Sequence, residues 1–175
     1  GNSELAVPQN TLGAELRQLE NKQWEQITLP HTPFGEPLTV LHQWQGICYY
    51  KKKITITPEE EKKHIWIEFE GAMHLADVWI NGKHVMQHAG GYTPFVVDAT
   101  GLLKTDKENE LLVRLDNRNN SLIPPGKPLE TLDFCYYGGI YRNVHLIAKA
   151  DVHITHPILD GHPAGAGIFI TYPKV

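Results

Sequence analysis

The chain has 175 residues, of which 41% are hydrophobic and 21% are charged, and its formal net charge is −4. A chain of this length and composition can bury one substantial core but hardly two, so we expect a single globular domain. The acidic balance argues against nucleic acid as a partner, and no apolar run is long enough for a membrane-spanning helix.

Strand signals dominate after a polar start. Residues 1–15 are mostly polar and predict a mobile N-terminal segment. Residues 49–56 and 65–70 alternate between two sets of side chains, which is the period of a β-strand with one face buried. Trp66 and Trp79 alternate with the core positions of their strands, and we expect both indoles to be buried rather than to form an exposed platform for sugars.

Charge and turn signals punctuate these strands. The lysines at 51–53 are followed by glutamates at 59–61, which predicts a solvated, charge-balanced sheet edge. Asn81-Gly82 between apolar runs favours a type I′ turn, because both central residues need positive φ. Residues 111–116 alternate again and predict another strand, and 117–128 predict a long loop with Asn-Asn-Ser and Pro-Pro-Gly as breakers. Many short strands with almost no helical period indicate a β-sandwich.

The run from Leu132 to Val144 is the most informative segment. It combines the carboxylate of Asp133 with three tyrosines and the pair Gly138-Gly139, which lets the backbone adopt positive φ or approach another surface closely. Arg142, Val144 and Leu146 then alternate with their neighbours and predict a half-buried strand. Asp133 is therefore expected on a loop at the mouth of a sheet, where binding residues are often found.

The pattern changes after residue 154. Residues 155–167 are rich in Gly and Pro and predict a linker, and residues 168–172 look like a strand that has no partner left in the chain. We therefore expect this chain to be part of a longer protein.

Four motifs follow one another along the chain: Trp24 with the run 27–32, residues 69–72 leading to 78–82, residues 90–95 leading to 98–111, and the junction 132–144. In this order they resemble the N-terminal domain of glycoside hydrolase family 2, which includes β-galactosidases, β-glucuronidases and β-mannosidases. The resemblance implies an all-β jelly-roll sandwich of the galactose-binding-domain type over 16–154. It also implies that 155–175 lead into an immunoglobulin-like domain, followed by a (β/α)₈ barrel.

The resemblance also implies a division of labour. The two catalytic carboxylates of the family lie in the barrel, so this chain alone is expected to be inactive. Asp133 matches an aspartate that reaches from this domain into the barrel pocket and accepts hydrogen bonds from the terminal sugar of a β-linked glycoside. From the residues alone, an aspartate that caps its own turn is the commoner case. Tyr136 is a second candidate for sugar contact, although packing against a neighbouring domain is the alternative. Arg142 is expected to be structural.

Three further functional interpretations stay open. The specificity could follow β-glucuronidases or β-mannosidases, since residues 35–46 do not match the galactosidase pattern. The chain could instead be a free-standing carbohydrate-binding module, or an adaptor that contacts only other domains. A polysaccharide-degrading role would favour a periplasmic or secreted location over the cytoplasm.

No cofactor or metal is predicted. The ten histidines form no recognisable ligand set, and Gly90-Gly91 lacks the lysine and helix of a phosphate-binding loop. Cys48 and Cys135 are expected to be separate thiols rather than a disulfide.

Overall fold

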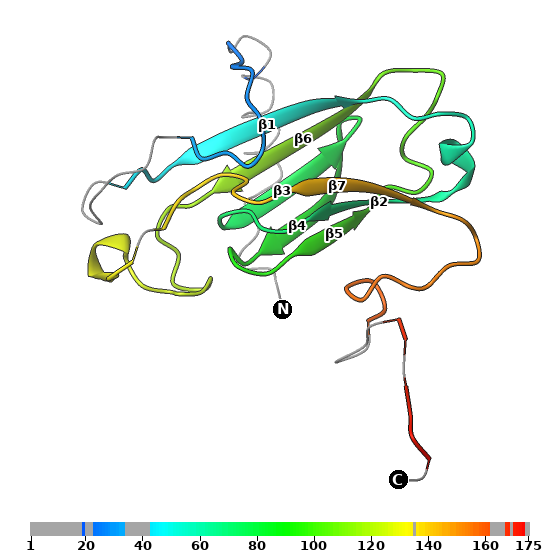
Figure 1. Cartoon of the computed structure of the whole chain (residues 1–175). Helices are drawn as coiled ribbons and strands as arrows, with labels where there is room; N and C mark the ends of the chain where they lie inside the picture. The colour runs from blue at the N-terminus through cyan, green and yellow to red at the C-terminus, as the bar shows by residue number, and fades with distance from the viewer. Residues whose placement is uncertain are drawn as a thin grey trace.

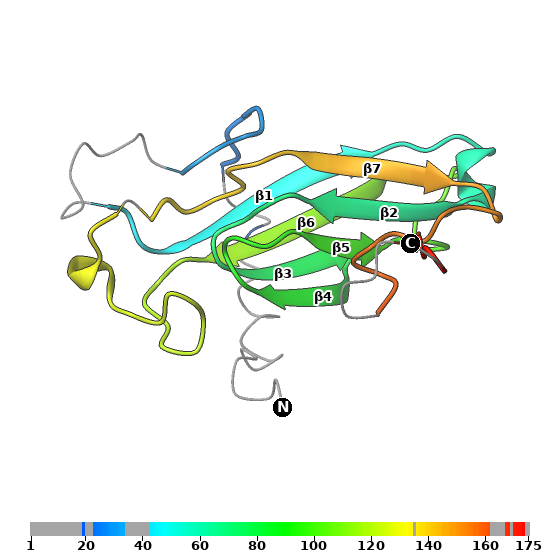
Figure 2. The same ribbon diagram turned by 60° about the horizontal axis from the view of Figure 1, so that its bottom comes forward.

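The computed structural model describes residues 19, 23–33, 43–134, 136–161, 167–168 and 170–173. Figure 1 shows two stacked layers of β-strands, with loops gathered at both ends, and Figure 2 shows the strands of both layers from below. The expected all-β jelly-roll sandwich is confirmed. The described strands are β1 (Ile47–Ile54), β2 (His64–Phe69), β3 (Leu75–Ile80), β4 (Lys83–Ala89), β5 (Phe95–Asp98), β6 (Asn109–Asp116) and β7 (Val144–Lys149), with single 3₁₀ turns η2 (Glu60–Lys62) and η3 (Leu129–Thr131).

Both sheets are antiparallel. One has the strand order β1-β6-β3-β4 and the other β5-β2-β7. The predicted turn between β3 and β4 is confirmed, because Asn81 has a φ of 51° and Gly82 a φ of 77°. The side-chain amide of Asn81 also donates to the carbonyl of Leu102 at 2.9 Å, so the turn is fastened to the loop before β6.

The main core lies between the two sheets. The alternating residues predicted from the sequence point inward, as Ile65, Ile67 and Phe69 do on β2. Cys48 packs against this core as a free thiol, and burial raises its pKa to about 12, whereas Cys135 lies outside the described residues.

The opposite face of the four-stranded sheet is also buried. Trp79 and Leu112 form a second cluster there, against which Leu19 and Tyr49 pack. Arg114 and Asp77 lie on this same face, since they alternate with core residues of β6 and β3. The expectation that Trp66 and Trp79 are buried is confirmed, with exposed fractions of 5% and 4%.

A buried ionic cluster spans β3 and β6. Arg114 Nη1 lies 3.6 Å from Asp77 Oδ2, and Arg114 Nη2 lies 3.4 Å from Asp116 Oδ2. Asp77 Oδ1 also accepts hydrogen bonds from Gln87 and is 3.1 Å from His84 Nε2. Burial alone would raise the pKa of the Asp116 carboxyl, but hydrogen bonds from Arg118 and the charges of Arg118 and Arg114 hold it below the ordinary value.

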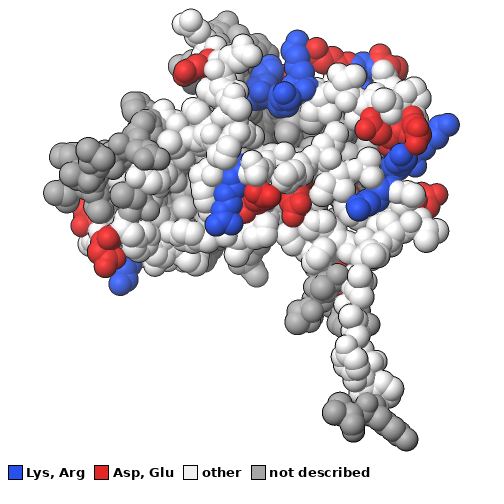
Figure 3. Space-filling model, in the orientation of Figure 1, with Lys and Arg blue, Asp and Glu red and all other residues white. Residues whose placement is uncertain are grey.

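Lysines of the edge strand β1 are paired with carboxylates beside it. Lys51 and Lys53 pair with Glu110 and Glu108 at 2.7 and 3.0 Å, and Figure 3 shows the two signs interspersed on this face. The charge balance of this edge is thus confirmed, although the partners lie in or next to β6 rather than at 59–61. β6 supplies them because it pairs with β1 residue by residue.

One prediction near the C-terminus, the half-buried strand that begins at Arg142, is wrong in its start and in the burial of Leu146. Arg142 lies before β7 rather than in it. Leu146 is 44% exposed, although it pairs with Ile67, which faces the core. The reason is that β7 is the edge strand of its sheet. The described residues among 168–172 are not paired with another strand, and the partnerless strand expected there stays a prediction. The predicted mobile segment 1–15 lies outside the described residues.

The segment after β7 folds back over the outer face of the three-stranded sheet. The rings of His153 and His156 meet the indole of Trp66 edge to face, with centroids 5.1 and 5.7 Å away. His156 Nε2 also lies 3.5 Å from a carboxylate oxygen of Glu68. Residues 150–160 thus form a strap over β2, which we call the C-terminal strap. None of the helices among the described residues is long and apolar enough to cross a membrane.

Candidate functional site

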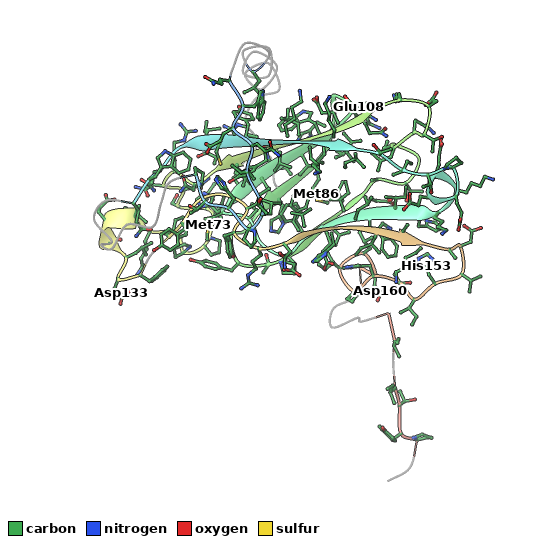
Figure 4. All side chains as sticks on the ribbon, turned by 45° about the horizontal axis from the view of Figure 1, so that its top comes forward. Met73, Met86, Glu108, Asp133, His153 and Asp160 are labelled. Atoms are coloured by element: carbon green, nitrogen blue, oxygen red, sulfur yellow. The ribbon has the colours of Figure 1, made fainter. Side chains whose placement is uncertain are left out.

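The long connection from β6 to β7 forms one end of the sandwich. Figure 4 shows Asp133 at the far end of this loop region, away from His153 and Asp160 at the opposite end. The connection contains the turn η3 immediately before Asp133. The sequence-predicted loop position of Asp133 is therefore confirmed.

Asp133 is exposed while residues on both sides of it are anchored. Tyr136 is only 4% exposed and forms a small cluster with Met73 and Leu129, against which Leu132 packs. This cluster is separate from the main core and supports the base of the loop. Among the described residues, no hydrogen bond or ion pair is made by the Asp133 carboxylate, so no bond of the turn-capping kind occurs there.

Polar contacts fix Tyr136 at its two ends. Its hydroxyl shares a short hydrogen bond with His74 Nδ1, and its backbone N–H donates to Gln43 Oε1. Gln43 Nε2 reaches the carbonyl of Phe134 at 3.5 Å. Burial lowers the pKa of His74 to about 4, so the imidazole is neutral at pH 7, and burial raises the pKa of Tyr136.

The Gly-Gly pair brings the loop against the sandwich. Gly139 has a φ of 93°, and a Cβ there would lie 2.5 Å from the Tyr50 hydroxyl and 2.6 Å from the His31 carbonyl oxygen. A Cβ on Gly138 would lie 2.8 Å from the side-chain amide of Asn117. Both roles predicted for this pair, positive φ and close approach, are confirmed.

Asparagines hold the start of the same loop. Asn117 accepts from the N–H of Gly46 at 2.8 Å and donates to the carbonyl of Trp44 at 3.0 Å. Asn119 accepts from Gln45 at 2.8 Å and from the N–H of Leu129 at 3.0 Å. Residues 43–46 and the loop therefore form one connected unit, and a small polar pocket beside it is lined by Asn119, Lys127, Leu132 and Tyr136 among others.

Comparison with known proteins identifies this arrangement. The family described as "Glycosyl hydrolases family 2, sugar binding domain" matches residues 6–150. The chain belongs to glycoside hydrolase family 2. The sequence resemblance stated above is thereby confirmed, and the loop that carries Asp133 is part of this family 2 domain.

Named relatives act on more than one sugar. The family 2 domain is 33% identical over 153 residues to a β-galactosidase of Thermoanaerobacter pseudethanolicus, covering 86% of this chain and 20% of that protein. It is 37% identical over 135 residues to a β-glucuronidase of Bacteroides fragilis, covering 74% and 18%. It also superposes on the crystal structure of a Bacteroides uniformis β-glucuronidase with a TM-score of 0.64 at 34% identity, covering 73% of this chain and 15% of that one. The chain thus spans a fifth or less of the length of these relatives.

Several residues of this family 2 domain escaped sequence reasoning. Gln43 and His74 lie 93 and 62 positions from Tyr136 along the chain, and no local sequence pattern predicts hydrogen bonds over such separations. Arg142, predicted to be structural, lies over the ring of Tyr141 with its guanidinium carbon 5.6 Å from the centroid. Among the described residues, no three His, Cys, Asp or Glu side chains are grouped so that they could hold a metal ion.

Acidification is expected to weaken the family 2 domain through His74. Its pKa is about 4 when folded against an ordinary value of 6.5, so between these values the unfolded chain binds more protons. The stabilisation is complete above pH 6.5 and is lost as the pH falls, by about 2 kcal/mol at pH 5. Urea unfolding at pH 7, 6 and 5 measures this loss.

His74→Asn serves as the control for this pH dependence, because every other histidine is the same in both proteins. The unvaried chain should lose about 2 kcal/mol more than His74→Asn between pH 7 and pH 5. Parallel curves for the two proteins would show that His74 does not contribute.

Proposed function

We propose that this domain belongs to a larger exoglycosidase that hydrolyses β-linked glycosides, and that it lends Asp133 to the subsite for the terminal sugar. The observation that carries the proposal is an exposed carboxylate without a described partner, on a loop held by the half-buried Leu132 and the buried Tyr136 at the end of a rigid sandwich. A carboxylate offers several acceptor sites and forms strong charge-assisted hydrogen bonds with hydroxyl groups. A β-galactosidase-like specificity leads, with β-glucuronidase-like or β-mannosidase-like specificity as the alternative.

The chemistry itself belongs elsewhere in the parent protein. Retaining glycoside hydrolysis needs two carboxylates about 5 Å apart, one as acid/base and one as nucleophile. Glu68 lies on the outer face of β2 and Glu70 directly follows this strand. Each is paired with a histidine, at 3.5 Å to His156 and 2.9 Å to His145 respectively. We propose that the isolated domain is inactive, that the catalytic pair comes from a barrel domain, and that 155–175 lead into an immunoglobulin-like domain.

The module hypothesis is less well supported. A free-standing carbohydrate-binding module would be expected to expose an aromatic strip, but Trp66 and Trp79 are buried under other residues. Hydrolysis of a panel of aryl β-glycosides by the full-length protein and by this chain would separate these functions. Cleavage by the full-length protein alone supports our proposal and names the sugar, whereas cleavage by the isolated chain contradicts it.

Asp133→Ala in the full-length enzyme is expected to lower kcat/KM at least about tenfold, or about 1.4 kcal/mol of transition-state binding. The reason is that an acceptor for sugar hydroxyls is lost while the fold is untouched. Steady-state kinetics on the best aryl glycoside measure the effect, with Asp106→Ala as the control, since Asp106 is an exposed aspartate between β5 and β6. Unchanged kcat/KM in Asp133→Ala would remove this residue from the pocket.

Tyr136 stays a second predicted sugar contact. Because its hydroxyl already bonds to His74 and the residue is nearly buried, direct contact would use the ring edge that lines the pocket. Tyr136→Phe keeps this ring for contact with the sugar and removes only the bond to His74, so the two roles of Tyr136 can be separated.

A further inference from the structure

We infer that Gln43 and His74 are positioning residues, which fix the Asp133 carboxylate by holding Tyr136 at its backbone and at its hydroxyl. This inference rests on the proposed function of Asp133. Neither residue touches Asp133 directly, and each acts through the backbone of the loop. The assignment also gives Tyr136 a role of its own, as the link between the sandwich and the loop.

Asp133 depends on its neighbours for its position. No described side chain or backbone group bonds to its carboxylate, so the direction of the side chain follows from the backbone at 132–134 and from the anchor at Tyr136. That backbone is held on one side by Leu132, which packs on the cluster of Met73, Leu129 and Tyr136. On the other side it is held by Tyr136. A binding residue whose neighbours are fixed needs less ordering when the ligand arrives.

His74 is itself rigidly placed. Its backbone N–H donates to the carbonyl of Asp116 at 3.3 Å, and its carbonyl accepts from the N–H of Gly90 at 3.0 Å. Next to it, the N–H of Met73 donates to the carbonyl of Gly139 at 3.0 Å. The imidazole is 3% exposed and stays neutral at pH 7, so one ring nitrogen remains available as an acceptor for the Tyr136 hydroxyl. The ends of β6 and β4 thus determine where the ring of Tyr136 lies.

Gln43 uses both ends of its amide. Its oxygen accepts from the N–H of Tyr136, and its nitrogen donates toward the carbonyl of Phe134. The amide therefore bridges the carbonyl of Phe134, the residue directly after Asp133, and the N–H of Tyr136. The segment that carries Gln43 is fastened in turn to Asn117 through Trp44 and Gly46. A side chain that lacks either amide group would release one side of this bridge.

The test is a double-mutant cycle in the full-length enzyme. His74→Leu removes the partner of the Tyr136 hydroxyl, and His74→Asn restores a polar group near the position of Nδ1. We expect His74→Leu to lower kcat/KM about fivefold to tenfold and His74→Asn to recover most of that loss. In the Asp133→Ala background, His74→Leu should change kcat/KM less than about twofold, because the residue through which it acts is gone.

Gln43→Met provides a second, milder cycle if His74→Leu does not fold. Methionine keeps the length of the side chain and removes both amide groups, and residue 43 is only half-buried. The same loss of coupling with Asp133→Ala is expected, together with an unchanged thermal midpoint.

The outcomes separate the two proposals. If Asp133→Ala has no effect on kcat/KM, the proposed function itself fails. If Asp133→Ala weakens catalysis but the His74 and Gln43 variants cost the same factor in both backgrounds, the positioning role is overturned while the function of Asp133 stands. Loss of coupling in either cycle, with recovery by His74→Asn in the first, supports the inference.

Discussion

Replacing Arg114 with methionine is expected to lower the free energy of unfolding by about 3–5 kcal/mol. The guanidinium and the Asp77 carboxylate are both almost completely buried, and Asp77 Oδ2 makes no hydrogen bond to the described residues. Without Arg114, this carboxylate keeps only Gln87 and His84 on its other oxygen. Urea unfolding of the isolated domain, followed by tryptophan fluorescence, measures the loss.

Arg118 offers a matched control for Arg114. It contacts the same Asp116 carboxylate at 2.6 Å, but its side chain is 59% exposed against 1% for Arg114. Exposed pairs contribute little, so Arg118→Met should lower stability by at most about 1 kcal/mol. The double variant Asp77→Leu with Arg114→Met should regain much of the loss, because it removes both buried partners together and leaves Asp116 paired with Arg118. Equal losses for the two single arginine variants would contradict the role assigned to burial.

Gly139→Ala is expected to destabilise the domain by about 3 kcal/mol or more. Alanine at a φ of 93° is strained by roughly 1–2 kcal/mol, and overpacking adds about 1–3 kcal/mol. The added carbon would meet the Tyr50 hydroxyl and the His31 carbonyl. The second belongs to a residue whose backbone N–H donates to the carbonyl of Ile140. Denaturant titration measures this change in the free energy of unfolding.

Gly101→Ala serves as the control that separates backbone strain from steric overlap. It has a φ of 73°, but a Cβ there would have no atom within 4 Å, so Gly101→Ala should show the strain alone, about 1 kcal/mol. Similar losses for Gly101→Ala and Gly139→Ala would mean that the close approach of the Asp133 loop to the sandwich is not tight.

The elements that the sequence predicts well are those determined by neighbouring residues. Asn81-Gly82 specifies its turn because positive φ is a property of those two residues, and the alternation at 65–70 identifies the inner face of β2. The Gly138-Gly139 pair likewise indicates a close approach without indicating to what. Tyr50 and His31, which it meets, are about 90 and 108 positions away, and no local pattern contains them.

The candidate site was predictable in part for the same reason. The position of Asp133 on an exposed loop followed from the run 132–144, but its supports did not. Gln43 is separated from the loop by several strands along the chain. His74 is one of ten histidines, and their spacing shows no recognisable pattern. The exposure of Leu146 depends on the place of β7 at the edge of its sheet, which is a property of the assembled topology.

The C-terminal strap makes the physical unit longer than the segment that defines the family. The family match ends at residue 150, yet His153 and His156 beyond it cover the indole of Trp66. A fusion that replaced the chain after residue 150 with another domain would remove the two histidines that cover the Trp66 indole. Such an exchange would leave an apolar ring open to water in the middle of β2. The folded unit therefore continues beyond the residues that the family match covers, at least to His156.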